Sequence, residues 1–414
     1  MKEVREGYKM SELGEIPEEW EVRSTGDVFN FSGGLSISRA KLGEYGINYL
    51  HYGDIHKRIE NYIDTATDEE WLPKLNDNYE NIKSGVKLET GDVVFADASE
   101  DYEGIGKSVA IFNSNNKEFV AGLHTIVAKD KEKLLDSNYK RYCFTTNAVR
   151  SKFRFLATGT SVYGISRENI KKINILVPPL KEQEKIAQIL STVDSQIDNV
   201  DALIEKNKEL KKGLMQKLLT EGIGHKEFKK TEIGEIPKAW EVKSLGEVFK
   251  LSSGNFLSQK DIVQGKYPVY GGNGVNGYHN KYLFEESKLV IGRVGAKCGC
   301  VHVSEPYCWI TDNALYIDKK IEGFNNMYMY YLLDYINLNN YANQNAQPVI
   351  SGQKIYSISI GMPSIDEQKQ IASILSSVDE NIEQYEDKKS KLEETKKGLM
   401  QQILTGKIRV VIKR

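Results

Sequence analysis

Cysteine, proline and long hydrophobic runs are scarce in this sequence. It has 4 cysteines and 9 prolines in 414 residues. So few thiols do not make the disulfide framework of a secreted domain, and we expect a reducing, cytoplasmic environment. No stretch reaches the roughly 18 to 20 consecutive apolar residues of a membrane helix, and the polar first residues are unlike a signal peptide. We therefore expect no contact with a membrane.

An excess of positive charge is also missing. The formal net charge is −2 at pH 7, whereas a protein that holds nucleic acid by itself normally carries a clear positive excess that neutralises phosphates. This balance counts against a stand-alone DNA-binding protein. It is compatible with a protein whose grip on DNA is local or is shared with partner subunits.

Catalytic motifs are absent as well. The sequence contains no Gly-x-Ser-x-Gly, no His-Glu-x-x-His and no persuasive carboxylate cluster, and its 6 histidines are scattered. Its one Pro-Pro pair, Pro178-Pro179, lies outside the Asp/Asn-Pro-Pro-aromatic tetrapeptide associated with amino-methyl transfer. We expect no catalytic residue and no cofactor in this chain, so any chemistry belongs to other subunits.

Three short segments resemble known sites only in part. "GIGKS" (104–108) has Asp101 where a P-loop needs glycine, and "VAIFN" after it is typical of a strand rather than a helix. "GGNGVNG" (271–277) matches a dinucleotide fingerprint, but no amphipathic helix follows, so a surface loop is favoured. Cys298, Cys300 and His302 lack the usual zinc spacing and fall on a predicted strand, which favours buried thiols and no metal.

What the sequence does contain is an internal repeat. "GEIPEEWEV" and "GEIPKAWEV" place Trp20 and Trp240 at positions 220 apart. Further along, "EQEKIAQILSTVD" and "EQKQIASILSSVD" place Gln183 and Gln368 at positions 185 apart. The same order of segments therefore occurs twice, and the part between the two markers is longer in the first copy. We call 12–22 and 232–242 the GEIP segments.

A long amphipathic helix follows each variable part. Apolar residues recur at alternating steps of four and three, the heptad spacing of a helix pair; they are Ile186, Leu190, Val193, Ile197, Val200, Ile204, Leu214 and Leu218, with Ile371, Leu375, Val378, Ile382, Tyr385, Leu392, Leu399 and Ile403 in the second copy. Each helix is predicted to span about 38 residues, or roughly 57 Å. An intramolecular, antiparallel coiled coil is favoured over two unrelated core helices. Polar residues in the seam can fix its register; they are Asn207, Lys211, Lys389 and Lys396.

The variable parts are predicted to be compact α+β domains. Short β-rich runs such as "GDVVFA" and "KLVIGRVG" alternate with Gly, Asn and Asp turns, and a shorter helical stretch lies near 137–153 and 325–338. The segment 137–172 carries eight basic residues against one acid, with aromatic residues interleaved. This pattern suits phosphate contacts, but a solvated helix face is an equal alternative. The acidic run 92–103 must face away from DNA or meet a basic partner.

The duplicated order of these segments resembles the specificity subunit of type I restriction-modification systems. The resemblance covers essentially the whole chain and is carried by Gly14, Ile16, Pro17, Trp20, Gly234, Ile236, Pro237 and Trp240, and by Leu180, Glu182, Gln183, Ile186, Ala187, Ile365, Glu367, Gln368, Ile371 and Ala372. One departure is Pro363-Ser364 in place of Pro178-Pro179. The resemblance implies an α+β fold with two β-rich target recognition domains held apart by two long antiparallel coiled-coil helices around an internal pseudo-twofold repeat.

The division that follows is a first target recognition domain with its N-terminal segment (1–179), a central spacer helix (180–222), a second target recognition domain (223–364) and a C-terminal spacer helix with a tail (365–414). By resemblance, each domain recognises one half of a bipartite, asymmetric double-stranded DNA site, and the helices set the gap. Two methylation subunits, which bind S-adenosylmethionine, and restriction subunits, which use ATP and Mg, would be the partners. The assembled complex would be a methyltransferase and an ATP-dependent endonuclease.

Candidate site residues follow from loop chemistry and from the resemblance. Asn, Gln and Arg pair with base edges and Lys with phosphates. The candidate DNA-binding residues are Ser36, Ser38, Arg39, Lys41, Lys107, Arg150, Lys152, Arg154, Thr160, Ser161, Tyr163, Asn255, Ser258, Lys260, Asn273, Arg293, Lys297, Asn313, Asn345, Gln347 and Gln353. The candidate partner-docking residues are Trp20, Glu182, Gln183, Trp240, Glu367 and Gln368.

Two other classes of protein are alternatives to a specificity subunit. A single-chain restriction-modification enzyme is disfavoured because methyltransferase and nuclease motifs are missing. A non-catalytic coiled-coil scaffold that joins partner proteins without recognising DNA is the serious alternative.

Overall fold

A computed structural model describes residues 4–76, 82–343 and 348–412, with only the backbone of Gln259. The chain forms two compact units. Unit 1 comprises residues 1–199 and 389–414, and unit 2 comprises residues 200–388. Each unit therefore contains one variable part of the sequence and a portion of both long helices. Among the described residues, no helix has the length and apolar character needed to cross a membrane.

The core of unit 1 is a five-stranded sheet in the order β4-β13-β9-β11-β7, in which only the β11–β7 pair is parallel. Its strands are β4 (Phe29–Gly33), β7 (Tyr62–Asp64), β9 (Val93–Ala96), β11 (Ser108–Phe112) and β13 (Thr125–Asp130). Alternate residues of β9 enter different cores, as the pleat of a strand requires. Val93 and Phe95 join the core that contains α4 (Asn147–Leu156), and Val94 and Ala96 join the core on the other side.

Unit 1 contains further strands and short helices outside this sheet. A second sheet has the order β12-β6-β8-β5, and β3 pairs with β15. The bounds are β1 (Tyr8–Ser11), β2 (Gly14–Pro17), β3 (Glu21–Ser24), α1 (Thr25–Val28), η1 (Arg39–Lys41), β5 (Leu42–Gly43), β6 (Ile47–Leu50), α2 (Tyr52–Lys57), α3 (Thr65–Asp68), β8 (Lys74–Leu75), η2 (Ser84–Val86), β10 (Ala98–Ser99), β12 (Phe119–Ala121), η3 (Tyr139–Arg141), β14 (Tyr163–Gly164), α5 (Arg167–Lys171) and β15 (Asn174–Val177).

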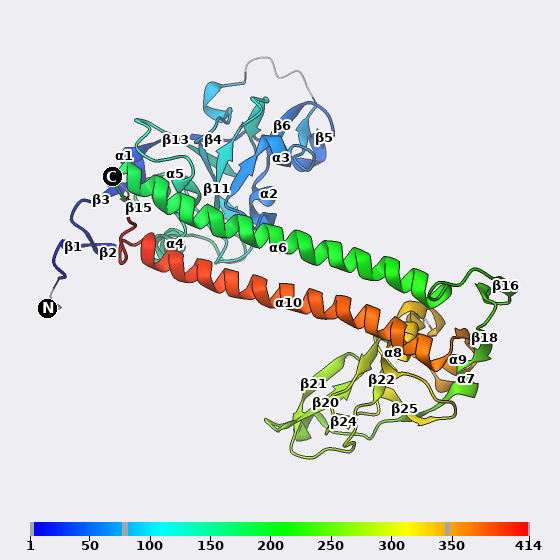
Figure 1. The fold of residues 1–414 in the computed structure, drawn as a ribbon. Helices are drawn as coiled ribbons and strands as arrows, with labels where there is room; N and C mark the ends of the chain where they lie inside the picture. The colour runs from blue at the N-terminus through cyan, green and yellow to red at the C-terminus, as the bar shows by residue number, and fades with distance from the viewer. Residues whose placement is uncertain (1–3, 77–81, 344–347, 413–414) are drawn as a thin grey trace. The chain divides into compact units, whose positions relative to one another are not determined.

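Unit 2 repeats the plan with fewer strands. Its larger sheet has the order β19-β25-β22-β23 and its smaller sheet the order β21-β20-β24. Figure 1 labels β20, β21 and β24 of the smaller sheet. The bounds are β16 (Phe228–Thr231), β17 (Gly234–Pro237), β18 (Glu241–Ser244), α7 (Leu245–Val248), β19 (Phe249–Ser253), η4 (Gln259–Asp261), β20 (Tyr267–Gly271), β21 (Gly274–His279), β22 (Leu289–Gly292), β23 (Val301–Val303), β24 (Trp309–Ile310), β25 (Ala314–Lys320), α8 (Asn326–Ile336), η5 (Leu338–Tyr341), α9 (Gly352–Tyr356) and β26 (Ser359–Met362).

The two long helices predicted from the heptad spacing are present. They are α6 (Leu180–Thr220, 41 residues) and α10 (Ile365–Ile403, 39 residues). In unit 1, Ile186 and Leu190 of α6 share a core with Ile403. In unit 2, Leu218 of α6 shares a core with Ile371 and Leu375 of α10. Both long helices therefore contribute to the core of each unit.

Local predictions fared unevenly. Residues 108–112 form strand β11 rather than the helix that a P-loop needs, as predicted. Residues 274–279 form strand β21 of a hairpin, so the expected absence of a helix is confirmed but the favoured surface loop was wrong for these residues. The strand prediction was wrong for Cys298 and Cys300, which lie outside strands, next to Gly299 with φ +86°. Cys298 is buried, whereas Cys300 is only partly buried. Among the described residues, no cluster of His, Cys, Asp and Glu suits a metal ion.

Candidate functional site

The GEIP segments form equivalent structures, which we call clamps, at the start of each long helix. Each clamp comprises a hairpin, the tryptophan that follows it and the glutamate to which this tryptophan bonds. Gly14–Pro17 and Gly234–Pro237 are the second strands of two hairpins with the same register. The tryptophan that follows is fully buried in both units, with Trp20 0% and Trp240 1% exposed. Trp20 Nε1 donates a hydrogen bond to Glu182 Oε2 at 2.8 Å, and Trp240 Nε1 donates to Glu367 Oε2 at 3.0 Å. Each tryptophan is thereby joined to the first turn of a long helix.

The glutamine after each of these glutamates joins its helix to the domain. Gln183 Oε1 accepts a hydrogen bond from the Asp136 backbone N–H at 2.8 Å, and its Nε2 donates to Pro178 O. Gln368 Oε1 accepts from the Asn325 N–H at 3.0 Å, and its Nε2 donates to Pro363 O. Both amides thereby satisfy backbone groups that would otherwise be buried without partners.

The six candidate docking residues thus lie in the interior. Glu182, Gln183 and Gln368 are buried like the two tryptophans, and the Glu367 side chain is only 13% exposed. A partner protein can therefore meet the surface around these residues but not most of the side chains themselves. One surface of this kind is a groove of about 690 Å³ in unit 1, lined by Leu13 and Gly14 of the clamp hairpin, by Ile197, and by Lys396 and Met400 of α10.

A different basic side chain closes each clamp. In unit 1, Arg409 Nε lies 2.5 Å from Glu182 Oε1, and its Nη2 also reaches Glu19 at 2.7 Å. The hydrogen bond to Glu182 raises the pKa of Arg409. In unit 2, His225 Nε2 lies 2.9 Å from Glu367 Oε1, which also accepts the Ile223 backbone N–H at 2.9 Å. The heptad pattern contained no signal for either of these side chains.

The loop after β4 exposes several of the candidate DNA-binding residues of unit 1. Ser36, Ser38, Arg39 and Lys41 are all exposed. Arg39 Nη1 is 2.7 Å from the buried Asp54 carboxylate, which orients its guanidinium. A groove of about 570 Å³ begins at this loop. Two basic side chains that were not among the candidates also line it, Lys83 and Arg167.

Other basic candidates of unit 1 hold their own domain together. Arg150 donates hydrogen bonds to the carbonyls of Glu103 at 2.6 Å, Ile105 at 2.7 Å and Gly106 at 3.1 Å. Lys107 Nζ donates to the carbonyls of His56 and Arg58. Burial lowers the pKa of Arg150 and of Lys107. In this conformation both side chains are engaged with backbone, which leaves little of them for phosphates.

Some residues of the basic segment 137–172 therefore pair with acidic residues of unit 1, whereas others are exposed. Arg154 pairs with Glu103 at 2.6 Å and Lys140 with the buried Asp130 at 3.0 Å. Lys152, Thr160 and Ser161 are exposed, while Tyr163 is partly buried. The acidic run 92–103 finds basic partners inside unit 1, such as Lys129, which lies 2.7 Å from Asp92. Burial raises the pKa of Asp92 in spite of that partner.

In unit 2, four loops bring polar candidates to one end of the sheets. Gly254 N–H bonds to Ala314 O, and the Arg293 N–H donates to Asn313 O at 3.0 Å. A Cβ on Gly272 would lie 3.3 Å from Asn313 O, so the β20–β21 turn reaches the same place. We call Asn255, Asn273, Arg293 and Asn313 the loop cluster of unit 2. Its three asparagines are exposed and Arg293 is partly exposed.

The other candidates of unit 2 lie around this cluster or away from it. The Ile350 N–H donates to Arg293 O at 3.0 Å, which brings the segment before α9 beside the cluster. Gln353 on α9, Lys297 and Lys260 are exposed, and Ser258 caps η4. Asn345 and Gln347 lie outside the described residues. Phe256, 73% exposed in the β19–η4 loop, was not among the candidates.

Comparison with known proteins assigns a family to this duplicated architecture. A family model described as the type I restriction modification DNA specificity domain matches residues 17–210 and again residues 237–394. A chain assigned as the MjaX specificity subunit of a type I restriction enzyme from Methanocaldococcus jannaschii is 32% identical, covering 98% of this chain and 97% of the relative. The MjaVIII specificity subunit of the same organism is 32% identical over 68% of this chain and 72% of its own length.

Solved structures share the fold. The S subunit of a type I restriction-modification system from M. genitalium aligns with a TM-score of 0.58 at 18% identity, covering 93% of this chain and 96% of that one. A chain from a study of complex assembly and conformational transition of a type I system aligns with a TM-score of 0.54 at 16% identity, covering 95% and 99%. The protein is thus an α+β protein with two copies of a DNA specificity domain. It belongs to the family of type I restriction-modification specificity subunits.

Proposed function

We propose that this chain selects the DNA sequence on which a type I restriction-modification complex acts, each target recognition domain binding one half of a bipartite, asymmetric site. The observation that carries the proposal is the contrast within the repeat. The two clamps share their hydrogen bonds, whereas the exposed loops that accompany them differ. Gly34-Leu35-Ser36 follows β4 and Gly254-Asn255-Phe256 follows β19. Different loops on a repeated framework suit two different half-sites.

The chemistry of the loop cluster supports base recognition. Arginine binds guanine and asparagine binds adenine through paired hydrogen bonds in the major groove. Arg293 and three exposed asparagines lie together in unit 2. In unit 1 the exposed Arg39, Lys41 and Arg167 supply phosphate contacts around the β4 loop, because phosphate binding needs charge rather than a particular base edge.

The proposed function also involves the long helices and partner subunits. The long helices act as a coiled-coil spacer that sets the gap between half-sites, with the domain division 1–179, 180–222, 223–364 and 365–414. Two methylation subunits dock on the surfaces next to the clamps, including the groove beside Leu13 and Met400, and restriction subunits join them. S-adenosylmethionine, ATP and Mg belong to those partners, and this chain itself carries out no catalytic step.

Footprinting tests the proposal against the scaffold alternative. The chain is purified together with its methylation partner and bound to DNA carrying sites that the host methylates. DNA recognition predicts two protected patches separated by an unprotected gap. A scaffold that only joins proteins protects neither patch, and that result would overturn the proposal.

A further inference from the structure

Each unit contains a Tyr-Asp-Lys triad that joins the helix pair to its domain. In unit 1, Lys396 Nζ of α10 lies 2.6 Å from Asp194 Oδ1 of α6. The Tyr142 hydroxyl donates a hydrogen bond to the other oxygen of Asp194 at 2.5 Å. Tyr142 directly follows η3, and its ring is part of the unit 1 core. One carboxylate of α6 thus holds both the second helix and the domain.

The same three residue types recur in unit 2 with the helices exchanged. Lys211 Nζ of α6 lies 2.7 Å from Asp379 Oδ1 of α10. The Tyr331 hydroxyl of α8 donates to Asp379 Oδ2 at 2.7 Å. Asp194 and Asp379 are 185 positions apart, as are Lys211 and Lys396, so the repeat has kept both charged members. We call these two sets the register triads.

The two ion pairs obey one antiparallel register. Residue numbers rise by 17 from Asp194 to Lys211 and fall by 17 from Lys396 to Asp379. A shift of α6 by one heptad in either direction would place Ile204 or Leu218 opposite Asp379. An apolar side chain cannot pair with that carboxylate, whereas the apolar seam residues tolerate such a shift much better.

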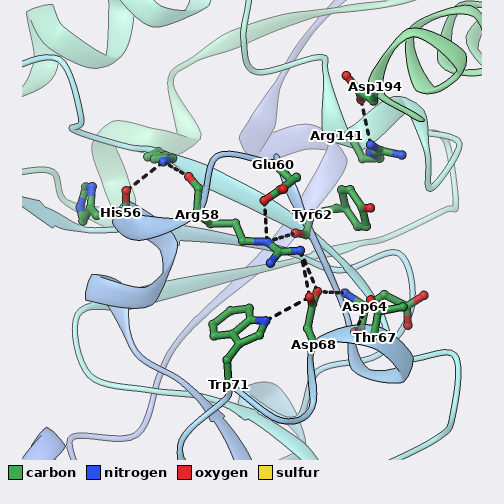
Figure 2. A network of polar contacts seen from close by, with 11 residues as sticks. His56, Arg58, Glu60, Tyr62, Asp64, Thr67, Asp68, Trp71, Arg141 and Asp194 are labelled. Atoms are coloured by element: carbon green, nitrogen blue, oxygen red, sulfur yellow. Dashed lines mark hydrogen bonds and ion pairs between the residues drawn. The ribbon is translucent and has the colours of Figure 1, made fainter. Parts of the chain in front are cut away.

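The tyrosines are held in the state that this bonding requires. Burial raises the pKa of Tyr142 and of Tyr331, so both hydroxyls keep their protons and donate to the carboxylates. In unit 1 a further contact stiffens the connection. Arg141 Nη2 lies 2.9 Å from Asp194 Oδ2, and its guanidinium carbon lies 4.0 Å from the centre of the Tyr62 ring on β7 (Figure 2).

The residues around Tyr62 continue this connection into the sheet of unit 1. Arg58 lies 3.0 Å from Glu60 and 3.0 Å from Asp68, and Trp71 Nε1 donates to Asp68 at 3.0 Å (Figure 2). A polar network therefore runs from the helix pair through Arg141 to the edge strand β7. Networks of this kind restrict orientation more than a purely apolar contact does.

We propose that the register triads fix the register of α6 against α10 and the seat of each domain on the helices, and thereby the number of base pairs that the protein accepts between the two half-sites. This inference rests on the proposed function. It assigns Asp194, Lys396, Asp379, Lys211 and the two tyrosines as positioning residues that touch no DNA.

The test measures binding to DNA duplexes that differ only in gap length. The chain, co-purified with its methylation partner, is titrated with sites of the natural gap and of gaps one base pair shorter or longer. The Lys211→Met, Asp379→Leu variant removes one ion pair without leaving a lone charge. We expect its preference for the natural gap to fall roughly five- to tenfold, while its choice of half-site sequence is unchanged.

Matched variants separate positioning from stability. Lys208→Met removes an exposed pair with Glu205 on the same helix (3.0 Å, side chains 50% and 72% exposed) and should leave the gap preference unchanged. The exchanged pair Lys211→Asp, Asp379→Lys should restore the preference of the wild type. An unchanged gap preference in the Met-Leu variant, with or without a lower melting temperature, would overturn the inference. A wild-type complex that binds no bipartite site would instead contradict the proposed function.

Discussion

Units 1 and 2 contain the same Trp-Glu hydrogen bond, but a different basic side chain binds the glutamate in each unit. Arg409 reaches Glu182 from the segment after α10, and His225 reaches Glu367 from the segment after α6. Gly406 and Gly222, with φ of +68° and +69°, begin these two segments and lie against the tryptophans. The difference shows that the repeat conserves the geometry of the clamp while the group that closes it is free to change.

The largest effect is expected from removing the cation of unit 1. Arg409→Ala leaves the fully buried Glu182 without its charge partner, which should cost about 3 kcal/mol of unfolding free energy. Chemical denaturation of the purified chain measures this cost. Glu19→Ala, which removes the exposed second partner of Arg409, is the control and should change stability by less than about 0.5 kcal/mol. Equal effects of the two variants would contradict the role given to the buried pair.

The loops that we propose to contact DNA should differ in function between the two units more than the clamps do. Arg293→Ala and Gln353→Ala in unit 2 are expected to weaken selection at one half-site by about 1 to 3 kcal/mol per lost base contact and to leave the other half unchanged. Binding to DNA libraries randomised in one half at a time measures this. Loss of selection in both halves together would refute the independence of the two domains.

Removing the shared hydrogen bond should show how equal the clamps are. Trp20→Phe and Trp240→Phe each delete the indole N–H and some buried volume, so we expect a similar loss of about 1 to 2 kcal/mol from both. Thermal unfolding of the two variants provides the comparison. A loss of stability in only one of the two variants would contradict the equivalence of the two hydrogen bonds.

The smallest expected effect concerns acid. Burial opposes ionisation of Asp130, but hydrogen bonds from Leu135 and Lys140 outweigh it and lower its pKa. Burial raises the pKa of Asp334 in unit 2. Asp130 therefore stabilises unit 1 above its unfolded pKa, and this contribution is lost as pH falls through the lower folded pKa. For Asp334 the sign is opposite, because protonation on acidification relieves a cost.

Asparagine variants measured at pH 7 and near pH 3 test these signs. Asp130→Asn should destabilise the chain at pH 7 and less at the lower pH. Asp334→Asn should be neutral or stabilising at pH 7, and the benefit should shrink in acid. Melting temperatures at the two values suffice, and the same sign for both variants at pH 7 would contradict the account.

Much of the architecture was predictable because it depends on periodicity and repetition. The heptad spacing of Ile186, Leu190 and their successors located both long helices, and the repeat predicted that Trp20 and Trp240 occupy equivalent positions. The partners of the polar groups were not predictable. Arg150, in the basic segment 137–172, and Lys107 look like phosphate ligands, yet each bonds to carbonyls of a loop more than forty positions away in sequence. Only tertiary contacts decide which acceptor lies near such a side chain.

The same reason explains why the two basic side chains that close the clamps were not predicted. His225 and Arg409 occupy polar segments with no pattern of their own, and their role appears only when the chain returns to the start of the other long helix. The turn of Cys298 and Cys300 was missed because alternation over so few residues does not separate a strand from a turn around Gly299.

Mapping the methylated positions in the host genome tests the central claim most directly. With the chain and its partners intact, the account predicts methylation in two different short half-sites separated by a fixed gap of unspecified sequence, and its loss when the gene for this chain is deleted. A single contiguous or palindromic motif, or methylation that persists without the chain, would contradict it.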